Sequence, residues 1–177
     1  MTEKNDTSRL NEKYIFRNIR QEEITQAAEI EKICFPPNEA CSYEHMEKRV
    51  DKAPELFLVA EDRTTGKIAG FLNGLSTDRE HLTDDFFTDA EVHDPNGKNI
   101  MLLGLDVLPK YQRQGLAREL VRCYKEREKA NGREKLILTC LPDKVEMYQK
   151  FGFKDHGIGD SVWGGEAWHE MSVELWG

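Results

Sequence analysis

The sequence lacks any long apolar run, and this absence limits the kinds of protein that it can encode. No stretch approaches the ~20 consecutive apolar residues that a membrane-spanning helix needs. Residues 1–13 also lack the apolar segment of a signal peptide, so secretion has no support in the sequence. We therefore expect a cytoplasmic protein with no membrane partner.

Positive charge is also scarce, since 25 Lys and Arg stand against 33 Asp and Glu, for a net charge of −8. Proteins that bind nucleic acid by neutralising phosphates carry a basic surface, so we expect no nucleic-acid partner. The charge is uneven along the chain: residues 110–135 carry a local charge of +5, and residues 78–94 carry −6. If the acidic segment borders a substrate site, it favours a cationic substrate.

Cysteine is sparse, with only Cys34, Cys41, Cys123 and Cys140 in the chain. Their spacings match neither the disulfide framework of a small secreted domain nor the CxxC pairs of a zinc site. We interpret them as reduced thiols that belong mostly to the core, and we expect no metal site.

The 177 residues suffice for one domain with a core of ordinary size. Hydrophobic residues make up 38% and charged residues 33%, which is typical of a globular protein with a heavily charged surface. Residues 1–12 are almost wholly polar and are predicted to form a disordered tail. Residues 13–177 are predicted to form a single domain.

Apolar periodicity predicts alternating strands and helices in the second half of the chain and a strand-rich first half. Strands are expected at 14–20, 55–61, 68–75, 99–107, 135–140, 153–156 and 168–175, and helices at 22–35, 42–50, 116–130 and 143–150. Residues 76–98 are expected to form a long loop with a helical turn near 82–87. This order predicts an α/β fold with one mixed central sheet flanked by helices.

The most informative stretch is residues 105–118, where a buried strand passes through a tight turn into an amphipathic helix. The first N–H groups of a helix have no internal partner, and the helix dipole adds positive character there. Gly115 permits close approach of a ligand, while Arg113 and Arg118 add full charges. The pattern suits a pyrophosphate site, and an ordinary strand–turn–helix junction stays open as the alternative.

Two motifs carry a family resemblance. The run Gln112-Arg113-Gln114-Gly115-Leu116-Ala117 resembles the (Q/R)xxGx(G/A) signature of the GCN5-related N-acetyltransferase (GNAT) superfamily. The preceding Leu105-Asp106-Val107 has the expected LxV form, and residues 147–153 resemble the (F/L)YxxxGF segment. The resemblance spans residues 13–175. Segments 29–35, 54–56 and 138–140 resemble the serotonin (arylalkylamine) N-acetyltransferase branch.

The resemblance implies that acetyl-CoA lies in a V-shaped gap between strands 100–107 and 135–140. The backbone of Leu105, Asp106 and Val107 would then bind the pantetheine arm and the acetyl carbonyl like an added strand. The pyrophosphate would lie on the turn, against Gln112, Arg113, Gln114, Gly115, Leu116, Ala117 and Arg118. Lys150 stands where the branch has a second cofactor-contacting residue.

The resemblance also implies an acetyl-CoA-dependent N-acetyltransferase in which the amine attacks directly in a ternary complex. Tyr148 matches the tyrosine that acts as general acid in the family. The general base departs from the family pattern, because the branch's two histidines align with Met101 and Leu103, and the superfamily's strand glutamate also aligns with Met101. The weak candidates for a replacement are Glu31, Asp106, His169 and Glu170.

The acceptor stays open at this point. A small, cationic primary amine is the leading prediction, and a protein or peptide amine is the alternative within enzymes. A non-catalytic acyl-CoA-binding module is a third hypothesis, and both a monomer and a homodimer remain open. Aromatic residues that could either line an acceptor pocket or pack in the core are Phe35, Phe86, Phe87, Trp163 and Trp168.

Overall fold

The structure is a computed structural model that describes residues 9–176. The predicted disordered tail needs a correction where it falls on these residues, since residues 9–13 are helical. Leu10 is only 5% exposed and packs in the main apolar cluster with Tyr14. One apolar side chain in a polar stretch therefore holds residues 9–12 against the fold, while residues 1–8 lie outside the described part.

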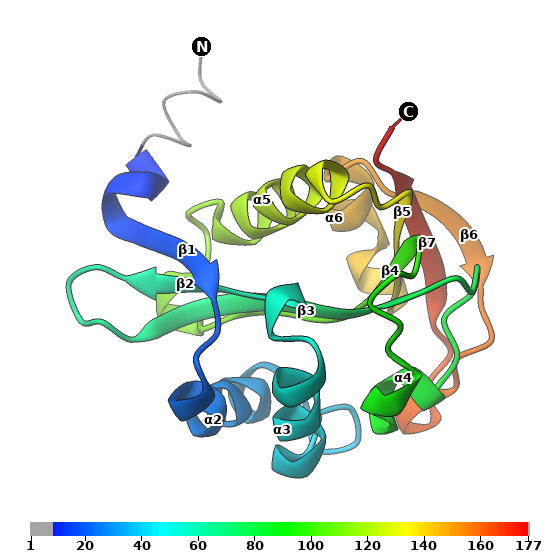
Figure 1. The fold of residues 1–177 in the computed structure, drawn as a ribbon, viewed down its shortest axis with the longest axis horizontal. Helices are drawn as coiled ribbons and strands as arrows, with labels where there is room; N and C mark the ends of the chain where they lie inside the picture. Colours follow the sequence, from blue (N-terminus) through cyan, green and yellow to red (C-terminus); the bar gives the residue numbers. More distant parts are fainter. Residues whose placement is uncertain (1–8, 177) are drawn as a thin grey trace.

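Seven strands form one mixed sheet in the order β1-β2-β3-β4-β5-β7-β6, which confirms the predicted α/β fold (Figure 1). The strands are β1 Tyr14–Asn18, β2 Phe57–Asp62, β3 Ile68–Thr77, β4 Asn99–Val107, β5 Lys135–Cys140, β6 Lys154–Ile158 and β7 His169–Glu174. Every neighbouring pair is antiparallel except β4 and β5, which run parallel.

Helices cover both faces of the sheet. The helices are α2 Ile24–Cys34, α3 Tyr43–Lys52, α4 Asp85–Thr88, α5 Leu116–Ala130 and α6 Val145–Lys150. In Figure 1, α5 and α6 lie above the sheet, and α2, α3 and α4 lie below it. Short 3-10 turns occupy Gln21–Glu23, Pro54–Leu56, Ala90–Val92, Pro109–Tyr111, Pro142–Lys144 and Trp163–Gly165. Among residues 9–176, no helix is long and apolar enough to cross a membrane.

Local sequence signals account for the ends of the helices. The Ser42 hydroxyl accepts a hydrogen bond from the His45 N–H at 3.2 Å and so caps α3, as expected. The helix α2 ends before Pro36, which cannot continue a helix. The helix α5 ends at Ala130 and is followed by Asn131 and Gly132, and Gly132 adopts a φ of 82°.

Some boundaries differ from the predicted ones. Pro54 starts a 3-10 turn, so β2 begins at Phe57 instead of residue 55. The expected long loop at 76–98 is more structured, because β3 continues to Thr77 and the segment contains α4 and a further turn. The predicted helical turn near 82–87 corresponds to α4 at 85–88.

The sheet opens beside β4. A register shift pairs Asn73 with Gly104 but Gly74 with Leu102, so Leu103 is an extra residue, a β-bulge in β4. The parallel pairing of β4 with β5 covers only three residue pairs and ends where Met101 meets Ile137. Beyond that point the two strands diverge, and among the described residues no strand pairs with this edge of β4.

Candidate active site

A cavity of about 1100 Å³ lies where β4 and β5 part. Leu116 and Val121 of α5 line it from one side of the sheet, and Glu31 and Cys34 of α2 line it from the other. The cavity therefore passes through the gap in the sheet. We call its two ends the α5 half, lined by residues 111–118 and 121, and the α2 half. The α2 half is lined by Glu31, Cys34, Phe35, Pro36, Glu39, Cys41, Arg49, Phe87, Trp163 and Trp168.

The turn before α5 has the backbone of an anion site. Arg113 has a φ of 65° and Gly115 a φ of 83°, and Arg113 is the only described non-glycine residue with a positive φ. When residues in the left-handed conformation alternate with residues in other conformations, successive backbone N–H groups point to the same side. Together they form a concave site that binds anions. A Cβ on Gly115 would meet nothing within 4 Å, so the space before the α5 N-terminus is open.

The side chains of the turn divide into two groups. Gln112 donates through its side-chain amide to the Val107 carbonyl at 2.9 Å, and the Gln114 side chain accepts from the Tyr14 hydroxyl at 3.0 Å. These two glutamines therefore fix the turn to the sheet. Arg113 and Arg118 are exposed where they line the cavity, and so they are available to a phosphate.

Leu116 and Ala117 start α5 with different degrees of burial. Leu116 is 1% exposed and belongs to the core, while Ala117 is half-buried at the cavity wall. These two small and apolar side chains leave the backbone of the first turn accessible from the cavity. A pyrophosphate fits this arrangement of backbone amides and flanking arginines.

Among the residues predicted to contact the cofactor, Lys150 and Asp106 do not line the cavity with their side chains. Lys150 is exposed on α6, forms an ion pair with Glu146 at 3.7 Å and does not line the cavity. Leu105 and Val107 line the cavity, but the Asp106 side chain does not and is 0% exposed. The role predicted for the Asp106 backbone stays a prediction, while its side chain belongs to the α2 side of the sheet.

Tyr148 of α6 lines the cavity. Its ring packs edge-on against Phe151 and Phe153, with centroids 6.0 and 5.7 Å away. Burial raises the pKa of Tyr148 above its ordinary range, and the nearby Cys140 and Asp106 act in the same direction. The phenol therefore stays protonated at neutral pH and can donate a proton.

The thiols in the cavity are poor nucleophiles. Burial raises the pKa of Cys34 and Cys41 to about 11, and that of Cys140 to about 12. A thiol must ionise to attack a carbonyl, so these three stay inert at neutral pH. As predicted, cysteine belongs mostly to the interior: Cys41 and Cys140 are buried, and Cys34 and Cys123 are half-buried.

A polar cluster fills the base of the α2 half. Glu31 accepts from the Cys41 N–H at 2.8 Å through Oε2. Arg49 is 3% exposed and donates to the Asn73 side chain at 3.4 Å and to a loop carbonyl at 3.1 Å. Glu31 Oε1 and both carboxyl oxygens of Asp106 are buried without a hydrogen-bond donor. The pKa of Asp106 is raised well above its usual range, mainly by burial and next by the charge of Glu31.

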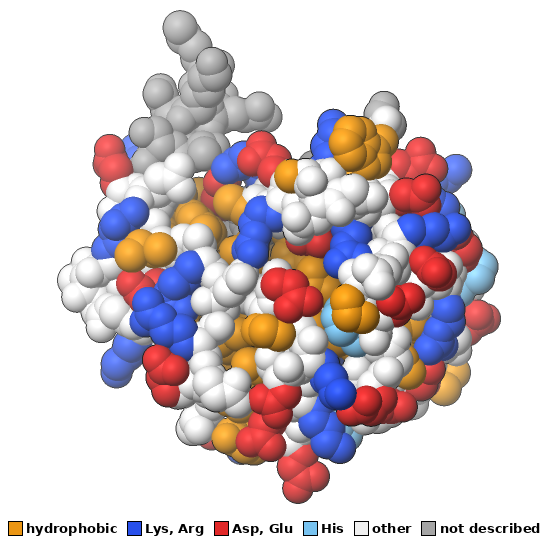
Figure 2. Space-filling model, viewed as in Figure 1, with side chains coloured by type: hydrophobic (Ala, Val, Ile, Leu, Met, Phe, Trp, Pro, Cys, Tyr) orange, Lys and Arg blue, Asp and Glu red, His pale blue; other side chains and the backbone are white. Residues whose placement is uncertain are grey.

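The acidic character of the α2 half comes from residues that the charge pattern did not single out. Glu39 and Asp143 line the cavity. The pKa of Glu39 is raised mainly by burial, and the charges of Glu166 and Asp143 add to this effect. Figure 2 shows acidic and basic side chains mixed over one face of the molecule, without one dominant patch. Within the α2 half, the two carboxylates of Glu31 and Glu39 stand against one cation, Arg49.

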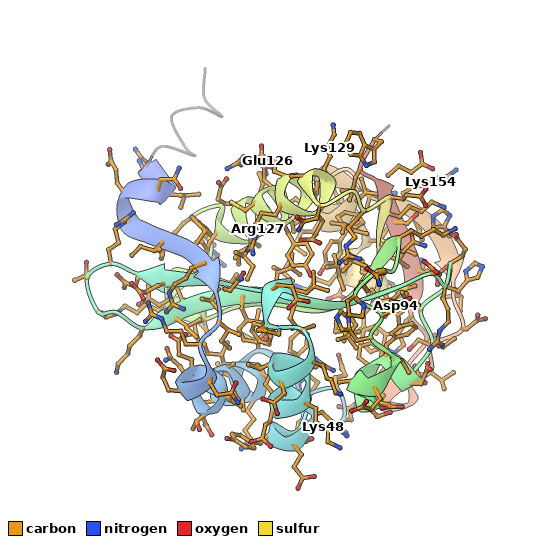
Figure 3. The ribbon with its side chains drawn as sticks, viewed as in Figure 1. Lys48, Asp94, Glu126, Arg127, Lys129 and Lys154 are labelled. Atoms are coloured by element: carbon orange, nitrogen blue, oxygen red, sulfur yellow. The ribbon has the colours of Figure 1, made fainter. Side chains whose placement is uncertain are left out.

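The acidic segment 78–94 does not have the position that we expected. Among the described residues, none of its carboxylates lines the cavity, and Phe87 is its contribution to the wall. Its acids are used locally: Glu80 pairs with Lys98 and Lys135, whose hydrogen bonds lower its pKa to about 2. The basic excess of 110–135 is likewise spread, since Lys129 points outward from α5 (Figure 3).

Aromatic side chains close the α2 half. Phe87 and Trp163 stack with ring centroids 5.1 Å apart, and the Trp163 indole donates to the Glu39 carbonyl at 2.9 Å. Trp168 donates to the Trp163 carbonyl at 2.8 Å. Phe86 is 1% exposed and packs in the core instead. Of the aromatic residues with two possible roles, only Phe86 is purely a packing residue.

The remaining base candidates lie outside the cavity. Glu170 accepts from the Leu82 N–H at 2.9 Å and contacts His81 at 2.8 Å, while His169 contacts Asp155 at 3.0 Å. Neither lines the cavity. Other lining or supporting residues escaped the sequence reasoning because no motif marks them: Arg9, Glu39, Arg49, Asn73, Gly104, Asp143 and Lys144.

A family model described as "Acetyltransferase (GNAT) family" matches residues 24–153 of the chain. The chain belongs to the GNAT acetyltransferase family. The predicted superfamily is thereby confirmed, while the resemblance to the arylalkylamine branch stays a prediction. The match covers the turn before α5, Tyr148 and the residues of the α2 half other than Trp163 and Trp168.

Solved GNAT structures share the fold at low identity. The loading GNATL domain of CurA from Lyngbya majuscula is 18% identical with a TM-score of 0.79, over 92% of this chain and 98% of that one. The ribosomal-protein-S18-alanine N-acetyltransferase from Escherichia coli is 18% identical, with a TM-score of 0.65 over 92% and 94%. The phosphinothricin acetyltransferase from Sinorhizobium meliloti, solved in complex with AcCoA, is 15% identical, with a TM-score of 0.66 over 92% and 89%.

A curated relative of this GNAT chain is much longer. The probable hydrolase YhcX of Bacillus subtilis (strain 168) is 28% identical over 158 residues, which make up 85% of this chain. The chain spans only 30% of the length of that relative. The similarity therefore concerns one part of YhcX.

Proposed function

We propose that the protein is an acetyl-CoA-dependent N-acetyltransferase whose acceptor is the primary amine of a small, cationic molecule. The observation that carries the acceptor is the charge of the α2 half. Glu31 and Glu39 line it, and Arg49 is the one cation among the residues that define this half. Glu31 is buried and its Oε1 has no hydrogen-bond donor, which an ammonium group would supply.

The α5 half suits the cofactor. The backbone amides from Arg113 to Arg118 would hold the pyrophosphate, and the open edge of β4 at Leu105 and Val107 would bind the pantetheine arm. Related GNAT structures were solved with acetyl-CoA or isobutyryl-CoA bound, which supports this assignment.

Tyr148 has the position and the protonation state of a general acid. The amine attacks the thioester carbonyl, the C–S bond breaks, and the sulfur leaves with the bonding electron pair. Tyr148 gives its proton to that sulfur, and the amide nitrogen finally replaces the proton. Because its pKa is raised, the phenol carries this proton throughout the neutral range.

Contacts between loops favour a small acceptor over a protein segment. Asn38 donates to the Gly164 carbonyl at 3.1 Å, and the Asp84 carboxylate accepts from the Val162 N–H at 3.2 Å. Together with the stack of Phe87 on Trp163, these bonds join three loops around the α2 half. A pocket closed in this way favours a compact amine over a polypeptide.

A thiol-release assay across a panel of acceptors tests this proposal. The panel holds 1,4-diaminobutane, 2-phenylethylamine, a lysine-containing peptide and a peptide with a free N-terminus. We expect thiol release and a mass-shifted N-acetyl product with the small amines, and weaker acceptor binding at high salt. Release with the peptides alone would favour the protein-acetylating alternative. Acetyl-CoA binding without release for any amine would leave the non-catalytic module.

A further inference from the structure

Two carboxyl groups face each other behind the gap in the sheet. Glu31 of α2 is 4% exposed and lines the cavity, and Asp106 of β4 is 0% exposed and lies behind it. Glu31 Oε1 and both Asp106 oxygens have no donor among the described residues. Two ionised carboxylates can only accept hydrogen bonds, and Arg49, the buried cation of this cluster, offsets one of the two negative charges. One proton bound by the pair offsets the other.

One proton shared by the two carboxyl groups removes the repulsion between two buried negative charges. Asp106 is the deeper of the two groups, and its pKa is raised mainly by burial. The neighbouring Glu31 and Cys34 raise this pKa further, while the charge of Arg49 of α3 lowers it. The proton of the pair therefore belongs on Asp106, the deeper group, while Glu31 is the carboxyl group at the cavity surface. A pair of carboxyl groups with one proton is a well-known arrangement for acid–base chemistry.

Both groups converge on one point beside Gly104. A Cβ placed on Gly104 would lie 3.2 Å from Asp106 Oδ1, 3.3 Å from the Asn73 amide nitrogen and 3.6 Å from Glu31 Oε1. Gly104 lines the cavity and belongs to the part of β4 that has left β5. A ligand atom beside Gly104 would therefore touch the carboxyl pair from the direction of the gap.

We infer that Glu31 is the base that takes the proton of the acceptor's ammonium group, and that protonated Asp106 is the positioning residue that holds Glu31. This inference rests on the proposed acetyl transfer and identifies the residue that receives the proton. It replaces the bases absent at Met101 and Leu103, whose side chains are an apolar thioether and an alkyl group.

The proton balance is complete with these groups. The acceptor enters as an ammonium ion and gives one proton to Glu31, which leaves a neutral amine and a neutral carboxyl pair. After the amine has attacked and the C–S bond has broken, the second proton replaces the one that Tyr148 gave to the sulfur. Glu31 then returns its proton to solvent, so no other reactant is required.

Three substitutions test the roles. Gln at position 31 cannot take a proton, so Glu31→Gln should lower kcat/KM for a cationic amine by about 100-fold or more. Asn at position 106 still donates a hydrogen bond to Glu31, so Asp106→Asn should keep most of the activity, whereas Asp106→Leu should lose it. Glu29→Gln, on the exposed face of α2, is the matched control and should leave the rate unchanged.

The pH profile separates a base from a structural residue. With Glu31 intact, kcat/KM should reach a plateau above the pKa of the base. In Glu31→Gln, the rate should rise about tenfold per pH unit, because only the amine that is already neutral can react. Acetyl-CoA affinity and melting temperature, measured on the same samples, show whether each variant is folded.

A second acceptor makes the test decisive. The best amine of the panel is compared with its β,β-difluorinated analogue at a pH at which the reacting amino group of the analogue is mostly neutral, because the fluorines lower its pKa, and needs no base. Glu31→Gln should lose activity with the parent amine and keep it with the fluorinated one. Equal losses with both amines, or an Asp106→Asn loss as large as that of Glu31→Gln, would overturn the inference. If the wild type acetylates no amine, the proposed function itself fails.

Discussion

Met101 of β4 and Ile137 of β5 form the last pair between the two parallel strands, six residues before β4 ends at Val107. Beyond this pair, β5 pairs only with β7, as far as Cys140 opposite His169. The bulge at Leu103 bends β4 at the same place. The cavity is therefore a consequence of strand pairing and not of a missing side chain.

Gly115→Glu should weaken acetyl-CoA binding by at least about tenfold. The substitution places a side chain and a negative charge in the open space before α5, where the pyrophosphate would lie. Titration calorimetry of wild type and variant measures the effect.

Gly132→Glu is the matched control for that prediction. Gly132 stands at the other end of α5 with a φ of 82°, against 83° for Gly115, and a Cβ there also meets nothing within 4 Å. Both variants carry the same backbone strain, about 1–2 kcal/mol for a left-handed non-glycine residue. If both lose the same affinity, strain and not the anion site explains the effect.

Tyr148→Phe should lower kcat by about 100-fold while acetyl-CoA affinity stays unchanged. The ring still packs against Phe151 and Phe153, so the fold should be preserved. Because the pKa of Tyr148 is raised, the wild-type rate should not fall up to about pH 10, the value at which an ordinary tyrosine loses its proton. A wild-type rate that falls near pH 9, or an unchanged kcat in the variant, would remove Tyr148 from the mechanism.

Gly104→Ala should raise the KM for the amine and leave acetyl-CoA affinity intact. The added methyl group would lie within 3.6 Å of Glu31 Oε1 and Asp106 Oδ1, in the space that the ammonium group would need. Steady-state kinetics with both substrates varied gives the two constants separately. An unchanged KM for the amine would place the acceptor elsewhere.

Asp106→Asn should stabilise the protein at neutral pH. A carboxyl group whose pKa is higher in the folded state binds its proton more tightly there, so stability falls as pH rises above the unfolded value of about 4. Asparagine removes this loss, since it has no proton to release. Thermal unfolding of wild type and variant should differ at neutral pH and converge near pH 4, and a gain that persists in acid would contradict the shared proton.

Most of the fold could be predicted from the sequence because the strands and α5 carry strong periodic patterns. Residues 9–12 could not, since a single Leu10 gives no periodic signal although it packs in the core. The α5 half of the cavity follows from a local motif at Gly115, where neighbouring residues along the chain form the site.

The α2 half could not be predicted in the same way. Glu31 and Asp106 are separated by many residues, and only the packing of α2 on β4 brings their carboxyl groups together. The charge pattern pointed to residues 78–94, but neighbouring cations such as Lys98 neutralise acids in that segment. A net charge along the chain does not show which carboxylates are already paired.

The affinity of a bisubstrate conjugate tests the central claim most directly, because one ligand must then occupy both halves of the cavity. The conjugate joins the sulfur of coenzyme A through an acetyl bridge to the nitrogen of 1,4-diaminobutane. The continuous cavity through the sheet predicts that it binds about 100-fold more tightly than coenzyme A alone. Equal affinity for the conjugate and for coenzyme A would contradict a donor site and an acceptor site that meet at the gap between β4 and β5.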